Sequence, residues 1–179
     1  MSSSIPSTLN FIDVLYSNSP HPDLGDACEL YSWLIGDWDA QLFEHNDDGS
    51  KIERAGEWHF AWVLEGRAVQ DVFIVPRRDA RSLELGKEGN RYGTTLRIYD
   101  HAQEAWRITW TNPVSGKENR LIARKVGDDI VQEGKDDDGS FIRWSFRNIQ
   151  ENSFHWIGEK STDQGSTWNV IVEFFCKRM

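Results

Sequence analysis

The sequence has only two cysteines, Cys28 and Cys176, and no pair of histidines at His-x-His or His-x-x-x-His spacing. A disulfide between cysteines so far apart is not required in a chain with room for a large core, and both thiols can simply be buried. The histidine spacing gives no support for a zinc site, so we expect no bound metal.

Long apolar runs and concentrated positive charge are also missing. No run is long enough to cross a bilayer as a helix, so we expect no membrane span. The net charge is −9, and arginines alternate with carboxylates instead of forming a stripe, which argues against a nucleic-acid partner. The segment Met1 to Asn10 has neither a basic nor an apolar stretch, so no secretory signal is expected and the cytoplasm is the predicted location.

Tryptophan, by contrast, is abundant: the chain of 179 residues has nine. Indole rings provide a large, rigid contact area, which favours binding of an apolar ligand or partner. The length is typical of one domain with one core.

The first 32 residues differ in pattern from the rest. Thr8 to Tyr16 and Asp26 to Leu34 have apolar residues at helical spacing, with Asp26 as the predicted N-cap. Ser17 to Gly25, with two prolines, is predicted to be a loop. We therefore expect residues 1–32 to form a helical lid or strap and residues 33–179 to form the main body of a single domain.

From Trp33 onward the hydrophobic period is two, and short β-rich segments alternate with turns, as in an all-β protein. The predicted strands are Gly36–Glu44, Lys51–Val63, Arg67–Val75, Arg91–Tyr99, Ala105–Thr111, Glu118–Lys125, Asp129–Gly134, Ser140–Arg147, Ser153–Lys160 and Thr167–Lys177. Tight Gly and Asp turns predict an antiparallel meander of about ten strands, and closure into a barrel removes its exposed edges. The long connector Pro76 to Asn90 is predicted to be a mobile flap over one mouth.

Gly36-Asp37-Trp38 resembles the Gly-x-Trp element that opens the first strand of lipocalins and their calycin relatives. Residues 64–72, LEGRAVQDV, and the phrase Ser161-x-Asp163-x-Gly165-x-Thr167-Trp168 resemble those of an uncharacterised bacterial group of small lipocalin-like proteins. The resemblance implies a β-barrel fold and does not name a reaction.

The second phrase also has the pattern of the Asp-box of sialidase propellers. A propeller repeats its blades, whereas this phrase occurs once, so the sialidase interpretation is rejected. We expect a structural hairpin in which Ser161 and Asp163 bond backbone amides, Gly165 has a positive φ and Trp168 covers the turn.

Alternating aromatic residues are predicted to face the barrel interior. Such a set either fills a small barrel or surrounds a ligand. The predicted ligand-contacting tryptophans are Trp58, Trp62, Trp110 and Trp156. Trp168 and Val170 are predicted to continue the inward face of the last strand.

Charged residues within the strands are the candidates for orienting a ligand or for acid–base chemistry. Arg97 and Arg143 could hold a carboxylate or carbonyl, and Asp71 and Glu173 are their expected partners and the candidate general bases. Taken one by one, each of these residues also fits an ordinary solvated position. The strand phase near Gly66 leaves open whether Gln70 or Asp71 faces inward.

Three functions are compatible with this sequence. The first is a barrel that binds a small apolar or aromatic molecule, which enters between the flap and the N-terminal helices. The second is an isomerase, cyclase or lyase on the same barrel, with Asp71 or Glu173 as base and an arginine stabilising negative charge. The third is a filled barrel that interacts with other proteins. Haem binding with His155 as axial ligand is a further alternative, and a homodimer is compatible with each of them.

Overall fold

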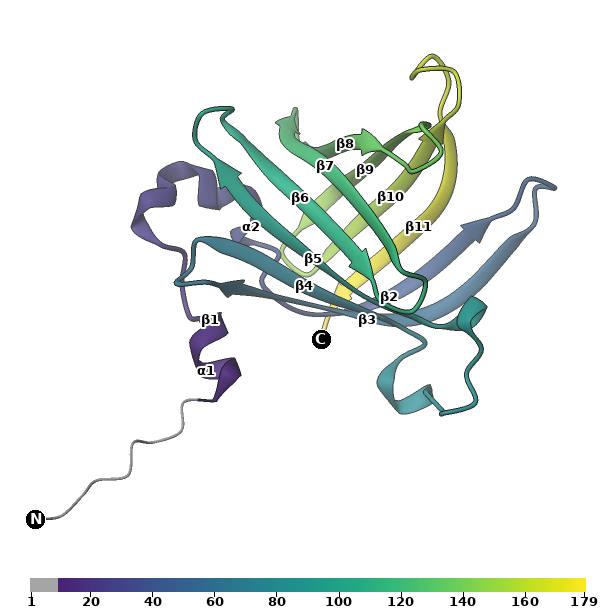
Figure 1. Ribbon diagram of the computed structural model, residues 1–179, viewed down its shortest axis with the longest axis horizontal. Coiled ribbons are helices and arrows are strands. Elements are labelled where there is room, and N and C mark those ends of the chain that lie inside the picture. Colours follow the sequence, from purple (N-terminus) through teal and green to yellow (C-terminus); the bar gives the residue numbers. More distant parts are fainter. Residues whose placement is uncertain (1–9) are drawn as a thin grey trace, which may run out of the picture.

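The computed structural model describes residues 10–179, which form one antiparallel sheet closed into a barrel (Figure 1). The barrel strands are β2 (Gly36–His45), β3 (Lys51–Val63), β4 (Ala68–Val75), β5 (Arg91–Asp100), β6 (Ala105–Asn112), β7 (Lys117–Val126), β8 (Asp129–Lys135), β9 (Phe141–Gln150), β10 (Ser153–Ser161) and β11 (Asn169–Arg178). Consecutive strands pair, and β11 returns to pair with β2, which closes the meander. The predicted ten-stranded barrel is confirmed.

Alternation along each strand places one set of side chains in a common core. On β3, Trp58, Phe60 and Trp62 are all less than 5% exposed and face inward, as their spacing predicts. Aromatic residues on the facing strands complete this core: Trp38, Trp106, Phe146, Phe154 and Phe174.

A short N-terminal segment covers one end of the barrel. It comprises α1 (Phe11–Leu15), the two-residue strand β1 (Tyr16–Ser17), the 3-10 helix η1 (Pro22–Cys28) and α2 (Glu29–Ser32). Tyr31 is fully buried against Trp106 and Phe146, with ring centroids 5.1 and 6.3 Å away. This end of the barrel is therefore closed by side chains of η1 and α2.

The predicted helices in this segment are too long, and the predicted N-cap is wrong. Residues 1–9 lie outside the described residues, so only part of the first prediction can be compared. The predicted loop contains most of η1, which begins at Pro22 and is capped by His21. Gly25 has a φ of 50° and kinks the chain, so Asp26 lies inside a turn and caps nothing.

The flap lies at the other end of the barrel. Residues 76–90 run from the end of β4 to the start of β5 and contain two short 3-10 turns, η2 (Arg78–Ala80) and η3 (Lys87–Gly89) (Figure 1). Because the flap and the N-terminal helices lie at opposite ends of the barrel (Figure 1), the predicted access route between them is wrong.

Glu57 ties the flap to the outside of the barrel. Its carboxylate accepts hydrogen bonds from the backbone N–H of Arg78 at 2.7 Å and from the Arg78 guanidinium at 2.9 and 3.0 Å. The guanidinium lowers the pKa of Glu57 to about 2 from its ordinary 4.5. The ionised anchor therefore contributes its full stability above pH 4.5, and this is lost as the pH falls toward 2.

Replacing Glu57 by glutamine should loosen the flap while the barrel stays folded, because the charge-assisted contacts to Arg78 are weakened. We expect trypsin to cleave several-fold faster after Arg77, Arg78 or Arg81, measured by mass spectrometry at pH 8. Glu84→Gln removes an exposed carboxylate from the same flap and should leave the rate unchanged. Equal rates in both variants would show that Glu57 does not anchor the flap.

Gly66 lets the turn between β3 and β4 pack against the N-terminal segment. Its φ is +80°, and a Cβ atom there would lie 2.2 Å from the carbonyl oxygen of Ser19. Its own carbonyl accepts a hydrogen bond from the His21 amide at 2.9 Å. Only glycine can adopt this positive φ without strain and also leave room for the Ser19 carbonyl oxygen.

Gly66→Ala should therefore destabilise the protein by about 2–4 kcal/mol, the sum of backbone strain and a clash with fixed backbone. Gly139→Ala is the matched control, since Gly139 also has a φ of +80° but open space around it. It should cost only about 1 kcal/mol. Urea unfolding of both variants measures the difference, and equal losses would mean that the contact with Ser19 carries no cost.

The turn between β10 and β11 has the predicted local hydrogen bonds. Ser161 Oγ accepts from the Gly165 amide at 2.8 Å, and Asp163 Oδ1 accepts from the Thr167 amide at 2.9 Å. Gly165 has a φ of +90°, and the Trp168 indole donates to its carbonyl at 3.1 Å. The structural interpretation is confirmed.

Three smaller predictions can also be compared with the structure. Trp168 precedes β11 and lies against Arg143 instead of continuing the inward face. Cys28 and Cys176 are both free thiols. Within residues 10–179, no helix combines the length and apolar character needed to span a membrane.

Candidate functional site

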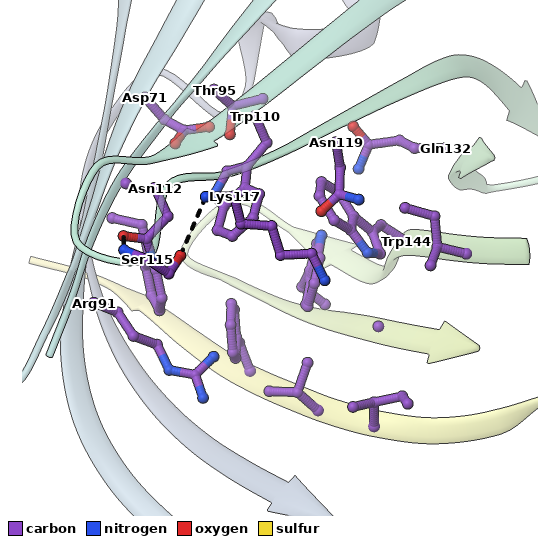
Figure 2. Close-up of a pocket in the computed structure, with 18 of the residues that line it drawn as sticks. Asp71, Arg91, Thr95, Trp110, Asn112, Ser115, Lys117, Asn119, Gln132 and Trp144 are labelled. Atoms are coloured by element: carbon purple, nitrogen blue, oxygen red, sulfur yellow. Dashed lines mark hydrogen bonds between the residues drawn. The ribbon is translucent and has the colours of Figure 1, made fainter. Parts of the chain in front are cut away.

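A cavity of about 390 Å³ lies inside the barrel near the flap end. This volume falls within the range of small-molecule pockets. Its walls are aromatic and come from six different strands: Trp58, Phe73, Trp110, Trp144, Trp156 and Phe174. Figure 2 shows Trp110 and Trp144 extending into this space.

These rings form a continuous aromatic wall. Trp144 contacts Trp110 edge to face at 5.9 Å and Trp156 at 5.8 Å, and Trp156 stacks on Phe174 at 4.6 Å. Trp110 and Trp144 are only half-buried although both lie on inward faces of their strands. Their exposed surface therefore faces the cavity, where it is available to an apolar ligand.

The floor of the cavity is polar. Asp71 on β4 and Arg97 on β5 form a buried ion pair, with exposed fractions of only 1% and 2%. Asp71 follows Val69 on the inward face of β4, whereas Gln70 points outward and donates to Thr94 Oγ1 at 3.0 Å. The strand phase near Gly66, which the sequence leaves open, is thus settled with Asp71 inside.

Arg97 also connects the floor to the closed end. Its guanidinium lies over the rings of Tyr31 and Phe60, 5.3 and 5.5 Å from their centroids. The Tyr31 hydroxyl donates to Gln132 Oε1 at 3.4 Å, and burial raises its pKa far above the ordinary 10. Tyr31 therefore stays neutral and carries its proton at physiological pH.

Four polar atoms on residues that line this cavity have no hydrogen-bond partner among the described residues. They are Trp58 Nε1, Asp71 Oδ1, Arg97 Nε and Gln132 Nε2, three donors and one acceptor. A buried polar atom without a partner costs about 1–3 kcal/mol. Each of these atoms has almost no accessible surface, so a ligand in the cavity would reach one only after a neighbouring side chain moved.

The mouth of the cavity carries charged residues. Lys117 and Lys160 both contact Asp136, at 2.9 and 3.3 Å, and Arg91 contacts Glu44. Burial alone would raise the pKa of Asp136. Hydrogen bonds from Lys117, from the backbone N–H of Asp137 and from Asn119 outweigh the effect of burial and lower the pKa to about 2. Asp136 is therefore ionised at neutral pH.

The sequence-predicted residues fall into two groups. Trp58, Asp71, Arg97, Trp110 and Trp156 all line the cavity. Trp62 is buried in the core but is not among the lining residues.

The other predicted charged residues lie on the outside of the barrel, so their expected inward placement is wrong. Arg143 donates to Glu159 at 2.9 and 3.0 Å and is not the partner of Glu173. Glu173 instead contacts His45 at 2.7 Å and His155 at 3.1 Å. The physical reason is alternation, because Trp144 and Phe174, their strand neighbours, face inward.

His155 does not fit the role of a haem ligand in the cavity. Its ring stacks on Phe175 at 4.3 Å, on the outer face of β10 and β11. Trp156, the next residue, takes the inward position. Within the described part of the chain, no three His, Cys, Asp or Glu side chains are arranged to hold a metal ion.

The sequence-based site omitted several polar residues that line the cavity. They are Thr95, Asn112, Asn119 and Gln132, with Lys87, Arg91, Lys117 and Lys160 near the mouth. Alternation along the strands is the signal that identifies two of them. Gln132 lies two residues after the buried Ile130, and Asn119 lies two residues before the buried Leu121, so each shares the inward face.

Comparison with solved structures identifies the fold. Rv2717c from M. tuberculosis has a crystal structure that matches with a TM-score of 0.56 and 15% identity, over 88% of this chain and 99% of that one. The S-type phycobiliprotein lyase CPES from Guillardia theta matches with a TM-score of 0.56 and 10% identity, over 86% and 92%. The chain has a lipocalin-like fold. No family model and no curated protein matches the sequence, so the likeness is one of structure.

The lipocalin-like barrel thus combines an apolar wall with a polar floor. Such a site can hold a small molecule by stacking and hydrogen bonds. The filled, protein-interacting barrel predicted as one alternative would have no cavity of this size, and therefore does not describe this interior.

Proposed function

We propose that this lipocalin-like barrel binds a small, largely aromatic molecule whose polar end reaches the floor formed by Asp71 and Arg97. The observation that carries the proposal is the enclosed cavity itself, where the half-buried rings of Trp110 and Trp144 line an apolar wall above a polar floor. An apolar body would stack on Trp110 and Trp144. A hydroxyl, carbonyl or amide at its end would bond the polar side chains at the floor, including Thr95, which pairs with Asp71 across the strands.

The floor favours a neutral polar group over an ion. Arg97 and Asp71 already neutralise each other, so an added buried charge would have no counterion there. A phenol matches the arrangement well, because it donates one hydrogen bond and accepts others.

Intrinsic tryptophan fluorescence during titration with 4-phenylphenol tests this proposal. We expect saturable quenching in the wild type and about tenfold weaker binding in Trp110→Leu, which removes one wall of the cavity. Trp168→Leu is the matched control, since this indole lies at the outer turn, over Arg143. It should leave the affinity unchanged.

Two results would count against the proposal. One is the absence of any saturable response, and the other is equal weakening by the two tryptophan substitutions. Mass spectrometry of the recovered compound adds a second readout, because a binding protein returns it unchanged. Conversion of the compound would favour the enzyme alternative, in which Asp71 acts as a general base.

A further inference from the structure

The charged residues that line the cavity are mainly cationic, in contrast to the acidic chain. Five basic side chains line it, Lys87, Arg91, Arg97, Lys117 and Lys160, against three acidic ones, Asp71, Asp136 and Glu159. The whole chain has a net charge of −9. The positive excess is therefore local to the cavity and is not a property of the whole molecule.

This excess lies at the mouth and not at the floor. Arg97 is neutralised by Asp71, and the Glu159 carboxylate is taken up by Arg143 and Arg147 outside the barrel. Near the mouth, one carboxylate, Glu44, contacts two arginines, Arg54 and Arg91.

Two of the remaining cations at the mouth are compensated by two carboxylates, so the excess comes from the arginine pair and from Lys87. Asp136 contacts both Lys117 and Lys160, and Asp138 adds a contact to Lys160. Lys87 on the flap has no salt bridge among the described residues. Figure 2 shows Arg91 and Lys117 reaching from two different strands over the space beside Trp110.

We propose that the ligand is an elongated aromatic acid that enters with its neutral polar end first and keeps its anionic group at the mouth, near Arg91 and Lys117. This inference rests on the proposed function and adds the charge and the orientation of the ligand. From Arg97 to Arg91, β5 runs about 20 Å between Cα atoms, at about 3.4 Å per residue, so a ligand must be elongated to reach from the floor toward the side chains of Arg91 and Lys117.

The electrostatic energy of a bound anion depends on its position in the cavity. An anion at the mouth meets partly hydrated cations and keeps some contact with water, so little desolvation opposes the attraction. An anion at the floor would lose its hydration without gaining an uncompensated cation. Positive charge at a narrow opening also concentrates anionic ligands and speeds association.

Calorimetric titration with matched acid and amide probes tests the inference. The first pair is 4'-hydroxybiphenyl-4-carboxylic acid and its carboxamide, which differ in charge but hardly in shape. The naphthalene analogues, 6-hydroxy-2-naphthoic acid and its amide, form a smaller pair. At low ionic strength the acid should bind about tenfold more tightly than the amide, and high salt should reduce this advantage.

Two substitutions on β7 separate a local effect from a general one. Lys117→Met removes a cation at the mouth. It should weaken binding of the acid by about threefold to tenfold and leave the affinity for the amide unchanged. Lys125→Met removes the same charge from the opposite end of the same strand and should change neither affinity.

The outcomes also distinguish this inference from the proposed function. Equal affinity of acid and amide, with no effect of salt or of Lys117→Met, would overturn the inference and leave the aromatic-binding proposal standing. Failure of both pairs to bind at all would contradict both.

Discussion

Replacing Arg97 by methionine should destabilise the protein by about 3–5 kcal/mol, because it leaves the Asp71 carboxylate buried without its counterion. Both side chains are almost completely buried, and Arg97 also covers the rings of Tyr31 and Phe60. Urea unfolding followed by circular dichroism measures the loss. Arg120→Met, which removes an arginine from an exposed pair with Glu118, should change stability by less than about 1 kcal/mol.

A double-mutant cycle shows whether this loss belongs to the ion pair. Asp71→Leu alone should also be costly, because it leaves the Arg97 guanidinium unpaired. The double variant Arg97→Met/Asp71→Leu should lose clearly less than the sum of the single losses, since no buried charge remains. If the two losses simply add, Asp71 and Arg97 do not stabilise each other and the polar floor is wrongly described.

Trp38→Ala should cost a similar amount, about 3–5 kcal/mol, through the loss of a large buried side chain. Trp38 is fully buried, its indole donates to the Leu34 carbonyl at 2.8 Å, and its ring packs on Trp33 and Phe154. The Arg178 guanidinium lies 4.1 Å above it. This one residue therefore links β2 to the segment that closes the barrel and to the end of β11.

The effect of Trp38→Ala should appear at the closed end first. Amide hydrogen exchange of residues 22–35 should accelerate more than that of β6 or β7, because the helical segment loses its main support. Trp168→Ala, at a partly exposed turn, should show a markedly smaller loss of stability. A small and uniform effect of Trp38→Ala would contradict the role assigned to the Gly36-Asp37-Trp38 element.

The barrel could be predicted because local and global signals agree along most of the chain. On β3 the alternation of Trp58, Phe60 and Trp62 with the smaller or polar residues Ala61 and His59 defines both the strand and its inward face. The turns around Gly49, Gly127 and Gly139 all have the positive φ that their sequences imply. Agreement at these positions fixes the order and the direction of the strands.

The site was only partly predictable, for two different physical reasons. On β4 both faces carry apolar residues, so alternation could not decide between Gln70 and Asp71. On β9 and β11 alternation is clear, and it places Arg143 and Glu173 on the outer face, next to the inward-facing Trp144 and Phe174. Their charge makes them candidates for holding a ligand, but their strand phase favours the solvated position that the sequence also allows for each of them.

The N-terminal segment illustrates a limit of local pattern. Apolar spacing predicted a helix from Asp26 to Leu34, but Gly25 kinks the chain and α2 spans only four residues. The conformation there follows from packing of Tyr31 and Leu34 into the end of the barrel, which no local rule contains.

The indole N–H resonances of the nine tryptophans offer the most direct test of an enclosed aromatic site. During titration with 4'-hydroxybiphenyl-4-carboxylic acid, the account predicts large shifts for Trp58, Trp110, Trp144 and Trp156, which line the cavity. The resonances of Trp33, Trp38 and Trp168, whose indoles bond backbone carbonyls elsewhere, should stay in place. Binding that shifts only this second group, or no shift at saturating ligand, would contradict the account.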